Sequence, residues 1–267
     1  MSNKLIILLI LQIIITIIGV SAYGSRLAGI KTKQLSTSFS LYNILNLVSR
    51  FANMIFLPLL GALVETAIKN NNINLLTNQF YSLLISILVG TVIAILILPT
   101  FTNFFEKLVN GLYKHKSFAV LFAKEFRWRN IKKLKNTIQF FDFKDIKKYS
   151  LKGLPKGSLL ILNPIIVAVY TVGYLSSLYA GALVPECRLV ASQLSSTVNG
   201  IGTILLYLFI DPMVGIISDG VIRDKKEYKE VESLIFYLCI GRLMGVILSF
   251  PLLIPLAHFI SKIAINI

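Results

Sequence analysis

Long apolar segments separated by short polar ones make up most of the chain. Six of them are long enough for a membrane-spanning helix, which needs roughly 20 predominantly apolar residues. The predicted spans lie near residues 5–22, 36–64, 80–104, 157–179, 189–210 and 234–260. The pattern therefore predicts an all-α, polytopic membrane helix bundle that forms a single integral membrane domain over residues 1–267.

Prolines and the length of the first span refine this prediction. The first apolar segment is too long for the core of a secretory signal peptide, so we expect it to remain part of the protein. The fifth span is expected to end at Asp211-Pro212, because proline suits a helix boundary. The sixth span contains Pro251 and Pro255, which kink a helix and free backbone carbonyls inside it.

Composition agrees with a membrane protein and directs attention to the basic residues. Hydrophobic residues make up 55% of the chain and charged residues only 15%, against about 45–50% and roughly 25% in soluble domains. The formal net charge is nevertheless +15. In a soluble protein this excess would indicate nucleic acid, but basic loops held between spans meet anionic lipid headgroups first, so we expect no nucleic-acid partner.

The basic residues gather in alternate loops. The longest connection, residues 106–156, holds 14 Lys and Arg against 4 Asp and Glu. The loops after the first and fifth spans are also basic, whereas the loops after the second and fourth spans hold one basic residue each. These residues are Arg26, Lys31 and Lys33, then Arg223, Lys225, Lys226 and Lys229, with Lys69 and Arg188 in the alternate loops. Because basic loops stay in the cytoplasm, both termini are predicted to be extracytoplasmic.

An amphipathic stretch follows within the cytoplasmic basic loop 106–156. Its apolar residues recur at helical spacing and its lysines point elsewhere: Ile131, Leu134, Ile138 and Phe141 against Lys132, Lys133 and Lys135. This pattern predicts a helix that lies in the membrane interface and contacts anionic lipids. Two roles stay open, one that only fixes topology and one that gathers an anionic substrate.

Polar residues follow one face of the second span. Asn43, Asn46, Arg50 and Asn53 have offsets of 0, 3, 7 and 10, which places them within about 80° of one another on a helix. An arginine near the centre of a span costs about 2.5–3.5 kcal/mol on insertion scales, so it must face protein or water. Its planar fork also suits phosphate oxygens. Arg50 is therefore a candidate ligand residue, with a purely structural pairing as the alternative.

Other polar residues inside or near spans have weaker patterns. Gln193, Ser196, Asn199, Gly200 and Thr203 form a small polar face of the fifth span that is typical of helix packing. In the sixth span, Arg242 lies between two glycines of a GxxxG pattern, and pairing and ligand roles are equally open. Three carboxylates near spans are possible charge partners of Arg50 or Arg242, namely Glu65, Glu186 and Asp211.

Motifs of nucleotide, metal and nucleophile chemistry are missing from the sequence. There is no P-loop, GxSxG, HExxH or Cys/His cluster. We therefore expect no metal, no cofactor and no enzymatic activity. The two cysteines, Cys187 and Cys239, are interpreted as small apolar residues rather than as a disulfide.

Several stretches, spread over nearly the whole chain, resemble the Amj family, the alternate lipid II flippases of bacteria. They are Tyr23–Gly29, Leu41–Asn43, Val48–Met54, Pro58–Gly61, Lys152–Gly157, Tyr179–Glu186, Gln193–Ser195, Asn199-Gly200 and Asp211-Pro212. The basic middle loop is the part least alike. The resemblance implies a multi-pass protein of the bacterial cytoplasmic membrane that moves lipid II, the undecaprenyl-pyrophosphate-linked peptidoglycan precursor, from the inner to the outer leaflet.

The resemblance carries no residue roles, so the site assignment comes from the residues themselves. We expect Arg50, and with it Arg242 and Arg26, to bind the pyrophosphate, while Asn43, Asn46 and Asn53 line a polar path. Two other functions remain open: a non-transporting scaffold of the cell-wall machinery that uses the basic loop, and a transporter of small solutes or ions. An oligomer is compatible with so small a bundle.

Overall fold

The computed structural model describes residues 3–115 and 138–267, and every regular element in these ranges is helical. The helices are α1 (Asn3–Lys31), α2 (Leu35–Lys69), α3 (Ile73–Leu96), α4 (Leu98–His115), α7 (Asn163–Leu183), α8 (Arg188–Leu205), α9 (Asp211–Ile222) and α10 (Tyr228–Asn266). Short helical turns lie at Phe143–Lys148, Ser158–Leu162, Pro185–Cys187 and Leu206–Ile210. Six segments in the described ranges are long and apolar enough to cross a membrane, which confirms the predicted polytopic bundle.

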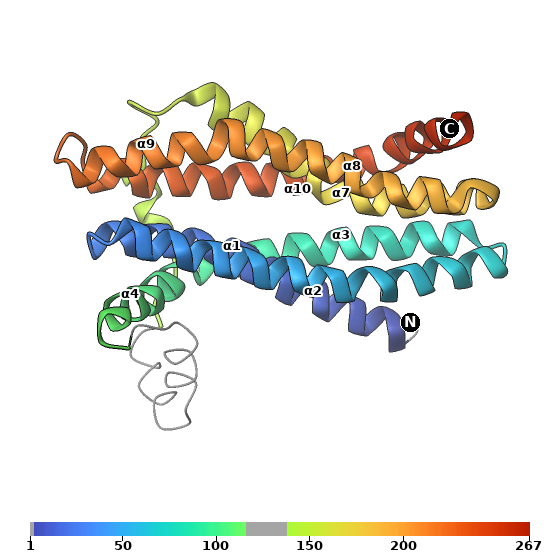
Figure 1. Cartoon of the computed structure of the whole chain (residues 1–267), viewed down its shortest axis with the longest axis horizontal. Coiled ribbons are helices and arrows are strands. Elements are labelled where there is room, and N and C mark those ends of the chain that lie inside the picture. The colour runs from blue at the N-terminus through green and yellow to red at the C-terminus, as the bar shows by residue number, and fades with distance from the viewer. Residues whose placement is uncertain (1–2, 116–137) are drawn as a thin grey trace.

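The bundle consists of two halves that lie side by side. Figure 1 shows α1 to α4 in one half and α7 to α10 in the other, with their long axes roughly parallel. The chain termini and the α2–α3 and α7–α8 turns lie at one end, called here the terminal end. The α1–α2 turn, α4 and the α9–α10 turn lie at the other, called the basic end because Lys31, Lys33, Lys225 and Lys226 lie there.

Apolar side chains from both halves hold the bundle together. Near the terminal end, one cluster combines Phe56 of α2 and Phe80 of α3 with Leu175 of α7 and Leu253 of α10, all fully buried. A second cluster lies toward the basic end and joins α1 to α9 and α10. Burying such apolar groups between helices leaves the polar faces of α2 and α8 outside both clusters.

The GxxxG pattern of α10 allows a close approach to α7. A Cβ atom at Gly241 would lie 3.1 Å from the carbonyl oxygen of Leu159, and one at Gly245 would lie 2.6 Å from that of Pro164. Backbone atoms cannot move aside as a flexible side chain can. The two glycines therefore let the helices touch through their backbones, as small residues do in membrane bundles.

This contact predicts a specific intolerance of added volume. Gly245→Ala is expected to lower the melting temperature of the purified protein, because overpacking costs about 1–3 kcal/mol. Gly200→Ala serves as the matched control, since a Cβ atom at Gly200 meets nothing within 4 Å. Thermal unfolding in detergent measures both variants, and an unchanged melting temperature for Gly245→Ala would contradict the close packing of α7 and α10.

The third span ends earlier than the sequence pattern indicates. We expected it to cover residues 80–104, but α3 ends at Leu96, and a separate helix, α4, begins at Leu98. Pro99 lies in the first turn of α4, where its missing N–H costs nothing. Because the buried residues Leu98, Phe105, Leu108 and Val109 lie on one face, α4 is an amphipathic helix that occupies the first part of the predicted basic loop 106–156.

The fifth span also differs, because its helix does not end at Asp211-Pro212. A π-helical turn at Leu206–Ile210 leads directly into α9, which begins at Asp211 and has Pro212 in its first turn. A turn of this kind holds one extra residue, and the wider spacing accommodates the proline ring. The continuous segment Pro185–Ile222 is therefore long enough to cross the membrane with several residues to spare.

The predicted interfacial helix at 131–141 is wrong in its second half. Ile138 and Phe141 lie in irregular backbone, whereas Ile131, Leu134, Lys132, Lys133 and Lys135 lie outside the described residues. The backbone N–H of Phe141 donates to the carbonyl oxygen of Leu96 at 2.8 Å, and its ring stacks on Phe236. This segment is thus held against the ends of α3 and α10 rather than forming a helix of its own.

Candidate functional site

A cavity of about 140 Å³ lies between the two halves, roughly midway along the bundle. Since a water molecule needs roughly 10–15 Å³ of such space, the cavity has room for several waters or one small anion. Helices α1, α2, α7, α8 and α10 all contribute to its lining. Its polar lining residues include Tyr23, Tyr42, Asn46, Arg50, Tyr207 and Arg242. We call this space the arginine cavity.

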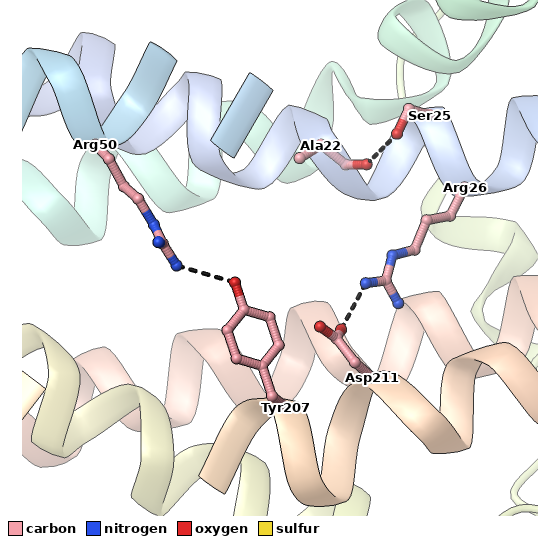
Figure 2. Close-up of polar contacts among 6 residues, drawn as sticks. All are labelled: Ala22, Ser25, Arg26, Arg50, Tyr207 and Asp211. Atoms are coloured by element: carbon pink, nitrogen blue, oxygen red, sulfur yellow. Dashed lines mark hydrogen bonds and ion pairs between the residues drawn. The ribbon is translucent and has the colours of Figure 1, made fainter. Parts of the chain in front are cut away.

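Arg50 reaches across from α2 toward the opposite half. Figure 2 shows its guanidinium directed at Tyr207, and Nη2 donates to the tyrosine hydroxyl oxygen at 3.0 Å. Its neighbours Leu47, Phe51 and Met54 are exposed apolar residues of the outer face of α2. A guanidinium has five N–H donors, so a single bond to a neutral hydroxyl leaves most of its capacity for an anion unused.

Arg242 enters the same cavity from α10. It follows Gly241, which lies close to Leu159 and Asn163 of the opposite helix, and it lines the cavity. Its Nη2 atom lies 3.6 Å from the position that a Cβ atom would take at Gly19 of α1, so this glycine leaves space beside the guanidinium. Its Nε atom is buried and finds no hydrogen-bond acceptor among residues 3–115 and 138–267, which is costly for a polar group away from water.

The charges of the arginine cavity are all of one sign. Arg50 and Arg242 line it, and no carboxylate is among its described lining residues. In surroundings less polar than water, two cations with little counter-charge attract an anion strongly. The arrangement is therefore suited to bind an anion with several oxygen acceptors.

A buried ion pair lies one helical turn from the cavity, toward the basic end. Arg26 Nη2 of α1 lies 2.5 Å from Asp211 Oδ1 of α9, and the two side chains are 8% and 16% exposed (Figure 2). The ring of Tyr42 lies against the other side of the guanidinium, with 4.0 Å between Arg26 Cζ and the ring centroid. Such a cation–π contact and a charge-assisted bond together hold Arg26 in place.

Comparison with known proteins assigns the chain to a family. The model of the family described as "Amj: Alternate to MurJ" matches residues 11–264. The chain belongs to the Amj family. A relative from Bacillus subtilis (strain 168), named "Lipid II flippase Amj", is 32% identical over 241 residues, which cover 90% of this chain and 89% of the relative. No solved structure matches the chain.

The arginine cavity of this Amj-family chain contains only part of the predicted site. It brings Arg50 and Asn46 of α2 together with Arg242 of α10. Asn43 is exposed and lies outside the cavity lining, and the side-chain amide of Asn53 donates to the Ser49 carbonyl of its own helix at 3.0 Å. The cavity is shorter than the polar face of α2, so it reaches only the middle of that face.

The carboxylates have partners other than those we expected. Asp211 pairs with Arg26, and Glu65 of α2 pairs with Arg188 of α8 at 2.8 Å, so neither pairs with Arg50 or Arg242. Glu186 is exposed in the turn between α7 and α8. The sequence could not choose among these possible partners, because helix spacing does not reveal which faces of distant helices meet.

The sequence analysis missed the tyrosines of the site. Tyr23, Tyr42, Tyr170 and Tyr207 all line the arginine cavity. A tyrosine hydroxyl inside a span needs a polar partner, so the tyrosines in the predicted spans could have indicated a polar cavity. The predicted packing face of α8 also has a mixed role: Thr203 lines the cavity and Asn199 packs against Gly173, whereas Gln193 and Ser196 are exposed.

Within residues 3–115 and 138–267, no group of three or more His, Cys, Asp or Glu side chains lies in a metal-binding arrangement. The chemistry available at the site of this Amj-family member is therefore that of arginine, amide and hydroxyl donors around a small cavity.

Proposed function

We propose that this chain is a lipid II flippase that moves the undecaprenyl-pyrophosphate-linked peptidoglycan precursor from the inner to the outer leaflet of the bacterial cytoplasmic membrane. The membership of the Amj family and the name of the Bacillus subtilis relative support this function. The observation that carries it is the arginine cavity, a space between two helix halves with two arginines and no carboxylate among its described lining residues. Such a space suits the diphosphate of a lipid-linked substrate.

In this proposal, Arg50 and Arg242 bind the diphosphate together. Arginine offers parallel N–H groups that match phosphate oxygens. Within the described part of the chain, Arg50 bonds to one tyrosine hydroxyl, which an anion can replace, and the buried Nε of Arg242 has no acceptor. Asn46 adds an amide donor to the same space. Arg26 can join them only when Asp211 is displaced, since the two form a buried pair.

The size of the cavity indicates how the rest of the substrate travels. About 140 Å³ accommodates a small anion but not a disaccharide-pentapeptide. The headgroup must therefore occupy space that opens when the two halves separate, while the lipid tail stays in the bilayer. Exposed Asn43 and half-buried Asn53 continue the polar face of α2 in both directions from Arg50, so they are proposed to line that wider path.

The orientation follows from the loops. The basic end is proposed to face the cytoplasm, because loops rich in Lys and Arg stay on that side. Both termini are then extracytoplasmic. The lysines of the basic end are proposed to contact anionic lipid headgroups, whose attraction is worth about 1 kcal/mol for each Lys or Arg near the surface.

Rescue of growth tests the proposed function. The intact chain is expressed in a bacterial strain whose own lipid II flippases have been depleted. Growth and cell shape are expected to recover. Continued lysis, with the chain present in the membrane at normal amounts, would contradict the proposal. An unrelated six-span protein expressed at the same level serves as the control.

A further inference from the structure

Two π-helical turns, called wide turns below because each holds one residue more than an α-helical turn, lie next to each other in the C-terminal half. One covers Ser158–Leu162 and precedes Asn163-Pro164; the other covers Leu206–Ile210 and precedes Asp211-Pro212. The two turns are in contact. In both, the proline lacks the N–H that would bond to the carbonyl four residues earlier, and that carbonyl lies in the middle of the wide turn. The prolines therefore explain why the helices widen there.

The turn at Leu206–Ile210 and the residue after it carry two arginine contacts that cross between the halves near the cavity. Tyr207, inside the turn, accepts a hydrogen bond from Arg50 at 3.0 Å. Asp211, the first residue after it, binds Arg26 at 2.5 Å. Figure 2 shows the two contacts side by side on this segment. A change in the turn must therefore affect both arginines.

The Arg26–Asp211 pair lies between the arginine cavity and a second cleft. That cleft has a volume of about 270 Å³ and is lined by Arg26, Ser38, Phe39, Asp211 and Gly215 among others. On α1, on α2 and along the α8–α9 segment, its residues lie nearer the basic end than those of the arginine cavity.

Three pairs show this offset. The cleft residues Arg26, Phe39 and Asp211 lie three or four positions along the chain from the cavity residues Tyr23, Tyr42 and Tyr207, respectively. With Tyr42, which lines the arginine cavity, packed on Arg26, the pair lies between this cavity and the basic end.

We infer that Tyr207 and Asp211 are positioning residues of the transport cycle: through the wide turn, they hold Arg50 and Arg26 when no substrate is bound and release them together. An anion on Arg50 replaces the Tyr207 hydroxyl and removes that restraint on the turn. If the turn then tightens to a regular α-helix, it no longer accommodates its extra residue, and the chain that follows rotates by the angle of one residue. Asp211 turns by roughly 100° relative to α8 and leaves Arg26.

Opening at Arg26 then joins the second cleft to the arginine cavity and offers a third guanidinium to the anion. This inference rests on the proposed function for the identity of the anion. That the Arg26–Asp211 pair separates the arginine cavity from the second cleft does not depend on it. Pro212 keeps the turn wide, because a regular helix would set its ring against the Leu208 carbonyl. Removing Pro212 should therefore favour the opened arrangement.

Thiol labelling tests the closure without substrate. Thr203 lines the arginine cavity, and Thr203→Cys is introduced in a chain that also carries Cys187→Ser and Cys239→Ala. Sealed inverted vesicles then present the proposed cytoplasmic face to a membrane-impermeant thiol reagent. The parent is expected to label slowly, whereas Pro212→Ala and Asp211→Asn are expected to label about tenfold faster or more.

Matched variants separate the closure from general loosening. Pro164→Ala removes the proline after the other wide turn. The neighbouring Asn163 donates to the Leu238 carbonyl oxygen of its own half at 3.1 Å, so this variant should label like the parent. Asp211→Glu keeps the carboxylate and should retain protection. Tyr207→Phe loses one hydroxyl only and should label faster than the parent. Parent-like labelling of Pro212→Ala, Asp211→Asn and Tyr207→Phe would overturn the inference.

Inorganic pyrophosphate then tests the link to the site. Added to the vesicles, it is expected to speed labelling of the parent but not of a chain that also carries Arg50→Ala. If the variants label faster but pyrophosphate changes nothing, the closure stands and the proposed anion site fails. If neither changes labelling, the inference fails, while the growth test of the proposed function remains independent.

Discussion

Replacing Arg50 by alanine is expected to abolish the rescue of growth while leaving the amount of protein in the membrane unchanged. Among the residues that the structure describes, Arg50 makes one hydrogen bond, to the Tyr207 hydroxyl, and its side chain is exposed. Its loss therefore costs the fold little. The diphosphate would lose one of two cations and the parallel N–H groups that match its oxygens, so its binding is expected to weaken at least tenfold, which is about 1.4 kcal/mol. Growth of the depleted strain and an immunoblot of its membranes measure the two effects.

Two further variants make the result specific. Arg50→Lys keeps the charge but loses the paired N–H groups, so rescue is expected to fail or to weaken strongly. Arg188→Ala is the matched control, because Arg188 also crosses between the halves but its pair with Glu65 is about half exposed and contributes little. Normal growth with Arg50→Ala would remove this residue from the site and would favour a scaffold that acts through the basic loop.

Replacing Arg26 by alanine is expected to destabilise the protein more than any other arginine substitution discussed above. The substitution leaves the Asp211 side chain, which is only 16% exposed, without its counter-ion. Breaking a buried pair in this way costs about 3–5 kcal/mol, a large share of the roughly 5–15 kcal/mol that stabilises a typical fold. The melting temperature in detergent and the amount in the membrane should both fall sharply.

A double variant distinguishes lost pairing from lost packing. Arg26→Leu with Asp211→Leu removes both charges, so most of the stability is expected to return, as replacing a buried pair by apolar residues is often neutral. Glu65→Ala with Arg188→Ala is the exposed counterpart and should change the free energy of unfolding by about 1 kcal/mol or less. If Arg26→Ala unfolds at the temperature of the parent, the ion pair does not stabilise the bundle.

The pattern of apolar segments predicted the bundle because a span must be long and apolar whatever it packs against. The same rule failed at residues 97–104. Phe101 and Phe104 continue the apolar run there, and only the amphipathic spacing of Leu98, Phe105 and Val109 reveals that a second helix has begun. At Asp211-Pro212 the proline rule indicated an end, whereas a wide turn accommodates the ring and the helix continues.

The candidate site was predictable only in part. Arg50 and Arg242 stand out because a charge inside a span is costly wherever it lies. Which carboxylate meets which arginine depends on how two helix halves align, and Asp211 meets Arg26 across 185 positions of sequence. Tyr207 and Asp211 are four residues apart, a spacing that brings two side chains to the same side of a helix, but the sequence analysis did not connect them. Their shared role becomes visible only once α2 and α1 lie opposite them.

The central claim concerns movement of lipid II across the membrane, and its most direct test is the amount of lipid II that becomes accessible in the outer leaflet. Cells depleted of their own flippases are treated with an impermeant probe that modifies lipid II only outside. Expression of this chain is expected to restore accessible lipid II to near the level before depletion, and expression of Arg50→Ala is not. Unchanged accessible lipid II, with the chain present in the membrane, would contradict the account.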